Sequence, residues 1–169
     1  AFTIFNQRGF EARPPELQQS RSFSDVRVYV TGDVNLGTAP SERLRAAAVT
    51  AEFFSVLRAR AIVGRTFTAD DVRSSEQIAV ISVRLWQRRF QSDPHILERT
   101  VLLNGQSFAV LGVMPPQVDV PDASDIWIPN GTHVRVEGDI PRTIVIARLA
   151  PRVSLREATV ELLSIMRTD

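Results

Sequence analysis

The sequence contains no cysteine, and this absence excludes several classes of site at once. Without thiols there is no disulfide bond, no thiolate nucleophile and no cysteine-ligated zinc or iron–sulfur centre. The redox compartment stays open, because a chain of 169 residues can form a core without covalent cross-links. Long hydrophobic runs are also missing. A membrane helix needs about 20 consecutive apolar residues, and runs such as 109–114 are far shorter.

Lysine is absent as well, so all 20 basic residues are arginine. They are interspersed with 19 acidic residues, which gives a net charge of +1. No field of one sign spans the chain, and tight non-specific nucleic-acid binding therefore has little support. The sequence also lacks a Gly-x-Ser-x-Gly elbow, a phosphate-binding Gly-x-x-x-x-Gly-Lys loop and a dinucleotide fingerprint. These absences argue against a nucleotide-dependent enzyme.

What is present is the composition of a folded protein. Hydrophobic residues make up 44% of the chain and charged residues 23%, both near the averages of globular domains. The length suits one domain or two small subdomains with a buried core. The chain begins at Ala1 without methionine or a leader-like stretch, so we expect it to be a piece of a longer protein.

Few residues could carry chemistry. The two histidines, His95 and His133, fall in separate polar loops, and neither has a second histidine at the spacing of metal ligands. We therefore expect surface positions. Asp70 and Asp71 are neighbours, whose side chains point apart on helices and strands alike. We predict that they satisfy backbone amides at a turn after Thr68 rather than share a catalytic proton, and we expect no cofactor.

Asp119, Asp122 and Asp125 recur at every third position, which invites a calcium interpretation. The stretch lacks the alternating oxygens, the turn glycine and the terminal glutamate of a calcium loop, so we do not predict a metal site. Residues 130–132 match a glycosylation triplet, but triplets of this kind recur by chance.

Periodicity predicts alternating strands and helices. In 25–36, Val26, Val28 and Val30 fall on one face and Arg27, Tyr29 and Thr31 on the other, which is typical of a strand. Residues 41–49 fit either element, because alanine favours helix while the alternation favours strand; we predict a strand. The other predicted strands are 77–82, 125–129 at a sheet edge, and 143–149, and the predicted helices are 14–22, 51–57, 83–90 and 154–167.

Capping residues define the expected helix starts. Thr50 is predicted to cap 51–57, and Ser82 to cap 83–90. Ser154 and Glu157 form the pattern of a capping box. The predicted buried stripes are Phe53, Val56 and Leu57; then Leu85, Trp86 and Phe90; and finally Leu155, Ala158, Leu162 and Ile165.

The second of these helices carries Arg84 and Arg88 beside its aromatic residues, as a nucleic-acid contact would. Arginine is the only cation of this chain, and the aromatic residues fall where a core stripe belongs. We therefore favour a solvated arginine face.

Residues 99–116 contain the best-defined local structure. Asn104-Gly105 is the strongest signal for a two-residue hairpin turn, because both central positions require positive φ. Such a turn places Leu103 opposite Gln106 and Val101 opposite Phe108. Phe108, Val110 and Gly112 would then share a side with Val101, and the prolines at 115 and 116 would end the pairing.

A series of short motifs runs along the chain in a fixed order. They are NL at 35–36, P-x-E-R-L-R from Pro40, VTAEFFSVL at 49–57, VGRTFTADD at 63–71, V-x-S-x-x-L-W-Q-R-R-F at 80–90, DP at 93–94, V-x-LNG at 101–105, VLGVMPP at 110–116, DIWIP at 125–129 and RLAPRVSLREA at 148–158. Over roughly 20–165 this series resembles the MacB-like periplasmic core domain of FtsX-type ABC-transporter permeases. The resemblance assigns a structural motif role to Phe53, Phe54, Gly64, Arg65, Phe67, Trp86, Phe90, Asn104, Gly105, Gly112, Pro115, Trp127 and Pro129.

The chain departs from this family at turn residues. The family usually has glycine at the positions of Arg58, Glu98 and Arg152, and proline at that of Ala61. Each change would tighten or shift a turn, and none removes a reactive group.

The resemblance implies an α+β fold of mixed sheets and short helices, in two subdomains with the second inserted into the first. Residues 1–34 and 138–169 would form a membrane-proximal, porter-like subdomain, and 35–137 the inserted one. The predicted strand and helix at each end of the chain fit this division.

The resemblance also implies a role. The domain would lie outside the cell inner membrane, periplasmic or extracellular, between two membrane helices of a permease. A cytoplasmic ABC ATPase would hydrolyse ATP, and the domain, not itself an enzyme, would relay the motion for export or envelope signalling. Its partners would include a second permease half or a homodimer, and a periplasmic protein. The alternatives are a free-standing periplasmic module for peptide or lipid and, with less support, a hydrolase using Asp70, Asp71 and a histidine.

Overall fold

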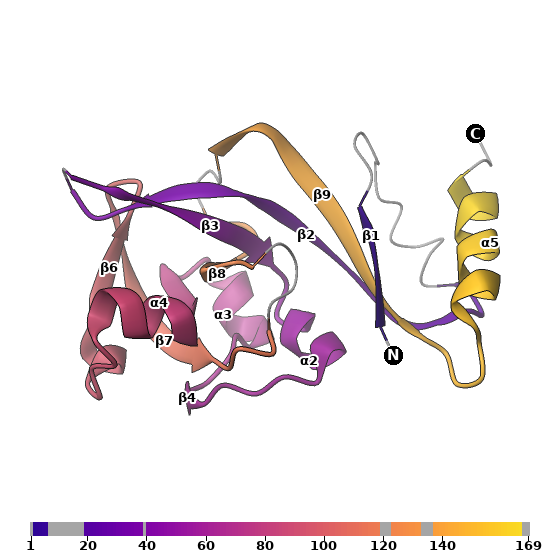
Figure 1. Cartoon of the computed structure of the whole chain (residues 1–169), viewed down its shortest axis with the longest axis horizontal. Helices are drawn as coiled ribbons and strands as arrows, with labels where there is room; N and C mark the ends of the chain where they lie inside the picture. Colours follow the sequence, from indigo (N-terminus) through magenta and orange to yellow (C-terminus); the bar gives the residue numbers. More distant parts are fainter. Residues whose placement is uncertain (1, 7–18, 39, 119–122, 133–136, 167–169) are drawn as a thin grey trace.

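The computed structural model describes residues 2–6, 19–38, 40–118, 123–132 and 137–166. These residues form one mixed sheet with short helices, which confirms the predicted α+β class (Figure 1). The strands are β1 (Phe2–Asn6), β2 (Phe23–Leu36), β3 (Glu42–Val49), β4 (Val63–Gly64), β5 (Ile78–Ser82), β6 (Thr100–Leu103), β7 (Gln106–Met114), β8 (Ile126–Pro129) and β9 (Glu137–Leu149). The helices are α2 (Phe53–Leu57), α3 (Ala69–Arg73), α4 (Val83–Phe90) and α5 (Leu155–Met166), with a 3₁₀ turn η1 (Ile96–Glu98).

Two long strands organise the sheet. Its order is β1-β9-β2-β3-β8-β5-β7-β4, with β6 paired to β2 and β7. β2 and β9, of 14 and 13 residues, pair antiparallel from Phe23 opposite Leu149 to Asp33 opposite Glu137. We call this pair the ribbon. In Figure 1 it runs from the neighbourhood of α5 to the remaining strands, β3 to β8, which with α2, α3, α4 and η1 we call the body.

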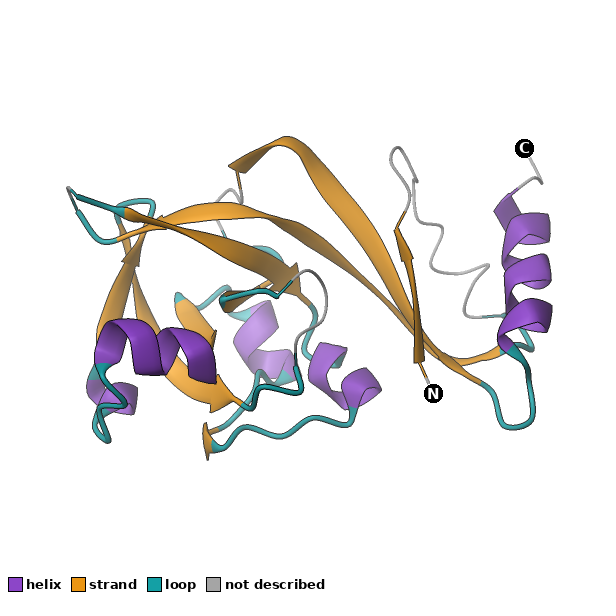
Figure 2. Ribbon diagram, viewed as in Figure 1, coloured by secondary structure: helices purple, strands orange, loops and turns teal. Residues whose placement is uncertain are grey.

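Three core clusters hold these parts together. At the α5 end, Ala158 and Leu162 pack against Phe23 and Val145 of the ribbon. In the body, α4 and η1 cover one cluster through Leu85 and Ile96. Another cluster contains Phe53, Phe54 and Val56 of α2 and is joined by Val72 of α3. The helices of the body therefore cover different core clusters of the same sheet (Figure 2).

The predicted hairpin is confirmed. Leu103 lies opposite Gln106 and Val101 opposite Phe108, and Asn104 and Gly105 have φ of 48° and 80°. One detail was wrong. The register of β7 against β5 shifts by one residue at Leu111, so Val113 rather than Gly112 continues the side formed by Phe108 and Val110. A bulge of this kind exchanges the faces of the residues that follow it.

The strand predicted at a sheet edge is instead interior. β8 pairs with β3 in parallel and with β5 antiparallel, and all four of its residues are buried. Its side chains are apolar and buried on both faces, as is typical of a strand inside a sheet that is covered on both sides. The strands predicted at 41–49, 77–82 and 143–149 are confirmed, although β9 begins earlier than predicted.

Two helix caps were predicted correctly and one was not. Ser82 Oγ accepts the amide of Leu85 at 3.1 Å, and Ser154 and Glu157 exchange the two bonds of a capping box. The N-cap of α2, however, is Glu52. Thr50 precedes a turn, its carbonyl accepts the amide of Phe53, and its hydroxyl oxygen is buried without a hydrogen-bond partner.

Three burial predictions also need correction. In α2 the buried residues are Phe53, Phe54 and Val56, with Leu57 only half-buried. In α5 Leu155 is 54% exposed, because it lies at the margin of the stripe that Ala158 and Leu162 form. Tyr29, predicted on the polar face of its strand, is 1% exposed because α2 packs on that face.

Some predictions fall outside the described residues. The helix predicted at 14–22 lies mostly there, and the described residues 19–22 form a turn leading into β2. His133, Asp119 and Asp122 also lie outside the described part of the chain.

Candidate functional site

A chain of aromatic rings joins the ribbon to the body. Tyr29 of β2 contacts Phe53 edge-on, with ring centroids 5.2 Å apart. Phe53 contacts Phe54 at 5.3 Å, and Phe54 contacts Trp127 of β8 at 5.8 Å and Phe67 at 5.9 Å. We call these five residues the aromatic junction. Three of these four contacts are edge-to-face, and the Phe54–Phe67 pair is tilted. Edge-to-face pairs contribute about 0.5–1.5 kcal/mol each beyond their buried area, so the junction resists separation of the two parts.

Polar contacts add to the same connection. The guanidinium of Arg148, on β9, donates a hydrogen bond to the carbonyl of Val56 in α2. Arg27 of β2 lies 2.7 Å from Asp25 and 3.8 Å from Glu52, the N-cap of α2. Each strand of the ribbon is thus tied to one end of the same short helix. The indole Nε1 of Trp127 is buried without a hydrogen-bond partner, so this ring is held by packing.

Two glycines allow a close approach of backbones beside the junction. Gly64 of β4 lies opposite Gly112 of β7. A Cβ atom on Gly112 would collide with the carbonyl oxygen of Arg65, and one on Gly64 with that of Leu111. The approach fixes the backbone at Arg65, whose guanidinium then reaches Asp71 in α3 at 2.5 and 3.1 Å.

Asp71 combines an ion pair with a helix cap. Its carboxylate also accepts the amide of Thr68 at 2.7 Å, and the Thr68 hydroxyl accepts the amide of Asp71. The hydrogen bonds from Arg65 and Thr68 hold the pKa of Asp71 well below its usual range, and the same carboxylate raises the pKa of Arg65. Asp70 points away and pairs with Arg73 at the surface. The predicted amide-binding role is therefore confirmed for Asp71.

The remaining residues of the family motif are dispersed. Trp86 and Phe90 pack half-buried against the α4 side of the core, and Trp86 Nε1 donates to the carbonyl of Asp93 at 3.0 Å. Asn104 joins the turn between β6 and β7 to the end of β2: its amide donates to the carbonyl of Asn35, and its Oδ1 accepts the Asn35 amide at 2.7 Å. Pro115 directly follows β7, and Pro129 ends β8 opposite Val49.

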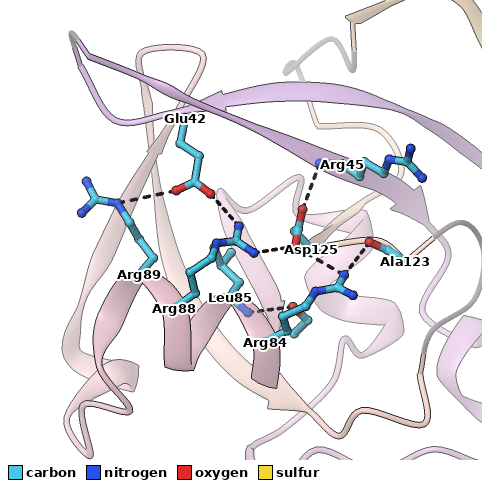
Figure 3. Close-up of polar contacts among 9 residues, drawn as sticks. Glu42, Arg45, Arg84, Leu85, Arg88, Arg89, Ala123 and Asp125 are labelled. Atoms are coloured by element: carbon cyan, nitrogen blue, oxygen red, sulfur yellow. Dashed lines mark hydrogen bonds and ion pairs between the residues drawn. The ribbon is translucent and has the colours of Figure 1, made fainter.

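An open hollow of about 420 Å³ lies between α4, β3 and the segment before β8. It is lined by Asp33, Arg43, Arg45, Arg84, Arg88, Ala123 and Asp125, and we call it the arginine hollow. Figure 3 shows Arg84 and Arg88 reaching from α4 toward Asp125, with Glu42 above Arg88. The predicted solvated arginine face is thus tied by ion pairs to β3 and to Asp125.

The described residues hold no group of side chains that could bind a metal ion. His95 is exposed, with its Nδ1 3.4 Å from Glu98 Oε1. No three histidine, aspartate or glutamate side chains of the described ranges are grouped as metal ligands. In the same ranges, no helix has the length and apolarity needed to cross a bilayer.

Sequence reasoning missed several residues that the fold brings together. Tyr29 is the one tyrosine of the chain, and its alternation with Arg27 and Thr31 along the strand predicted an outward side chain. Arg148 was visible as a lone charge inside an apolar strand, which is a signal of a specific partner. Glu161 of α5 accepts the amides of Arg21 and Ser22, both at 3.1 Å. Hydrogen bonds from Ser22, first of all from its hydroxyl, lower the pKa of Glu161.

Solved structures share this fold. The periplasmic region of MacB from Actinobacillus actinomycetemcomitans superposes with a TM-score of 0.74 at 21% identity, over 99% of this chain and 82% of that one. The extracellular domain of the ABC-type transporter YknZ from Gram-positive bacteria gives 0.64 at 17% identity, over 86% and 74%. The fold is therefore that of extracytoplasmic domains of ABC-type transporters.

Sequence comparison identifies the family. The profile of the MacB-like periplasmic core domain matches residues 3–165, and the chain belongs to this family. Macrolide export ATP-binding/permease proteins MacB from two Campylobacter jejuni strains are 29% and 30% identical over 133 residues. That match covers 78% of this chain but 19% of each relative, so the chain spans about a fifth of their length.

Proposed function

We propose that this chain is the extracytoplasmic part of an ABC-transporter permease, and that it relays ATP-driven motion from the membrane side to its far end without catalysing a reaction itself. The observation that carries this proposal is the ribbon. Two strands of 14 and 13 residues stay paired between the α5 cluster and the body. Close-packed interiors transmit displacement because they deform little.

A relay of motion also needs two parts of the chain that move together. We propose that residues 1–34 and 138–169 form the membrane-proximal subdomain, and that 35–137 form the inserted one. The cluster around Ala158 draws on the first part, and the cluster around Phe108 mainly on the second. The remaining cluster contains residues of both, such as Ile144 and Phe53. A shared core cluster favours joint movement of the two parts.

The assembly around the domain is also a proposal. Membrane helices would flank the chain and place it outside the cell inner membrane, in the periplasm or extracellular space. A cytoplasmic ABC ATPase would drive it, with a second permease half or a homodimer and a partner protein outside the membrane. The names of the relatives specify macrolide export. For this chain we propose the broader role of export or envelope signalling.

A reversible cross-link tests whether the ribbon works as a rigid element. Val30 and Thr143 are partners across β2 and β9, and these 169 residues contain no cysteine that could replace either thiol in the cross-link. Paired strands hold such positions about 4.5–5.5 Å apart, within the range of a disulfide. In the intact transporter, we expect the oxidised Val30→Cys/Thr143→Cys variant to keep its transport rate. Transport that stops on oxidation and returns on reduction would show that the ribbon must bend, against the proposal.

A second variant loosens the connection instead. Arg148→Gln removes the guanidinium that holds Val56 in α2, and Arg152→Gln changes an exposed arginine just past the same strand. We expect Arg148→Gln to lower transport per ATP hydrolysed while Arg152→Gln does not, with both proteins folded by circular dichroism. Equal coupling in the two variants would remove α2 from the relay.

The alternative of a free-standing periplasmic module is tested separately, by reading the gene on both sides of this chain. Flanking apolar segments of about 20 residues would exclude that alternative.

A further inference from the structure

Two of the four asparagines of this chain are followed by glycine. Asn104-Gly105 forms the turn between β6 and β7, and Asn130-Gly131 lies directly after β8. An Asn-Gly pair is chemically labile, because the side-chain amide lies close to the next backbone amide and glycine has no Cβ to hinder their approach. Asparagine is accordingly one of the thermolabile residues of proteins. The surroundings of each pair decide which of the two reacts first.

The reaction needs only water. The backbone nitrogen of the glycine attacks Cγ of the asparagine, and the side-chain nitrogen leaves as ammonia with the proton of the attacking amide. A succinimide ring forms, which water then opens at either of its carbonyl carbons. One opening gives aspartate. The other gives isoaspartate, in which the main chain runs through Cβ and Cγ and is longer by one atom. Both products carry a new negative charge.

Asn130 has the surroundings that this reaction needs. Asn130 and Gly131 are both exposed, and apart from chain neighbours nothing lies within 4 Å of the place where a Cβ of Gly131 would be. Within the described part of the chain, neither the Asn130 side chain nor the Gly131 amide forms a hydrogen bond. The amide of Thr132 closes the turn by donating to the carbonyl of Pro129 at 3.3 Å. The two reacting groups can therefore approach each other without breaking a hydrogen bond of their own.

Asn104, in contrast, is held by β2. Its Oδ1 accepts the amide of Asn35 at 2.7 Å, and its own amide donates to the carbonyl of Asn35 at 2.9 Å. The side chain is thus directed at the neighbouring strand rather than at Gly105. Cyclisation must first break the bond to Oδ1, and the loss of one intramolecular hydrogen bond lowers the reactive population by about two- to tenfold.

We propose that Asn130 is a site of spontaneous deamidation in the folded protein and that the fold protects Asn104 from the same reaction. The modification places a negative charge at the end of β8, and its isoaspartate form lengthens the turn after Pro129. The amide of Asn130 donates to the carbonyl of Val49 at 2.8 Å, so the altered turn lies beside the segment that leads into α2. This inference does not depend on the relay of motion.

Mass spectrometry tests the proposal with an internal control. Trypsin cleaves after arginine, and residues 100–135 form one such peptide, which contains both asparagines. The purified chain is incubated at mildly alkaline pH, where the attacking amide loses its proton more readily, and samples are digested at intervals. Fragment ions between positions 104 and 130 assign each mass increase, and electron-transfer fragmentation separates isoaspartate from aspartate. We expect Asn130 to deamidate about fivefold faster than Asn104, with isoaspartate among the products.

Unfolding the chain separates the effect of the fold from that of the local sequence. In guanidinium chloride the bond between Asn104 and Asn35 is lost, and each Asn-Gly pair lies in a flexible chain, so the two rates should become similar. Similar rates in the folded protein, or a faster reaction at Asn104, overturn the proposal. A preference for Asn130 that is equally large in the unfolded chain also overturns it, because the fold would then have no part in the selection.

A variant with a matched control confirms the assignment. Asn130→Gln should lower the total deamidation of residues 100–135 severalfold, to the rate of Asn104, because glutamine would have to close a larger ring. Asn35→Gln changes another exposed asparagine, which is not followed by glycine, and should leave the total unchanged. Circular dichroism checks that both variants fold. Undiminished deamidation in Asn130→Gln would assign the reaction to another residue and refute the site.

Discussion

Replacing Arg58 by glycine should stabilise this domain. Arg58 ends α2 in the left-handed conformation, with φ 54° and ψ 35°, and its amide donates to the carbonyls of Phe54 and Ser55. An L-residue in this region brings its Cβ too close to the following carbonyl oxygen, whereas glycine has no Cβ. Glycine is also the residue that the family resemblance leads one to expect here. The Arg58 side chain is exposed, so little packing is lost.

The expected gain follows from two opposing effects. Relief of the left-handed conformation contributes about 1–2 kcal/mol, and the greater freedom of glycine in the unfolded chain costs about 0.5–1 kcal/mol. The free energy of unfolding should therefore rise by about 0.5–1 kcal/mol. For a domain of this size, each kcal/mol raises the melting temperature by about 2–4 °C.

Urea and thermal unfolding measure this change against matched controls. Arg58→Ala keeps a Cβ and should leave the stability nearly unchanged. Arg60→Gly lies two residues further on, at an exposed position with an ordinary negative φ, and should lose about 0.5–1 kcal/mol. Arg152, with φ 67°, offers an independent repeat of the gain. If Arg58→Gly destabilised the domain as much as Arg60→Gly, the strain at the end of α2 would not exist.

Two further predictions concern the region beside the aromatic junction. Gly112→Ala should cost about 1–3 kcal/mol in urea unfolding, because its Cβ meets the carbonyl oxygen of Arg65; a variant as stable as the parent would disprove the close approach of β4 and β7. Asp71→Asn should cost about 2 kcal/mol at neutral pH through the lost ion pair and cap. Arg65 lowers the pKa of Asp71 in the folded state. The carboxylate therefore stabilises the fold fully at a pH above 3.8, its ordinary pKa, and loses this effect as the pH falls below that value. The stability difference between parent and Asp71→Asn should therefore shrink below about pH 4, and a pH-independent difference would argue against the pair.

Local structure was predictable wherever neighbouring residues decide it. The Asn104-Gly105 hairpin, the Ser82 cap and the Ser154–Glu157 capping box all form as expected. Each depends on positions at most a few residues apart, where backbone conformation and one side-chain oxygen set the outcome. The family was also predictable from the sequence, because the order and spacing of its short motifs can be read without a structure.

The candidate sites were only partly predictable. Phe53, Phe54, Phe67 and Trp127 were singled out through the resemblance, but nothing local showed that they meet or that Tyr29 joins them. Arg84 and Arg88 were correctly placed on one helix face. Their contact with Asp125 joins segments about 40 residues apart, and the contact of Arg88 with Glu42 joins segments 46 apart.

The sequence by itself determined the Asn104-Gly105 turn, the starts of α4 and α5 and the family of this protein, since these depend on residue identity at short range. Only the tertiary structure decided that β8 lies inside the sheet, that Glu52 rather than Thr50 begins α2, and that Tyr29 is buried. These outcomes depend on which distant segments pack against one another. Burial of apolar surface is non-directional, so the pattern of one segment does not specify its neighbour.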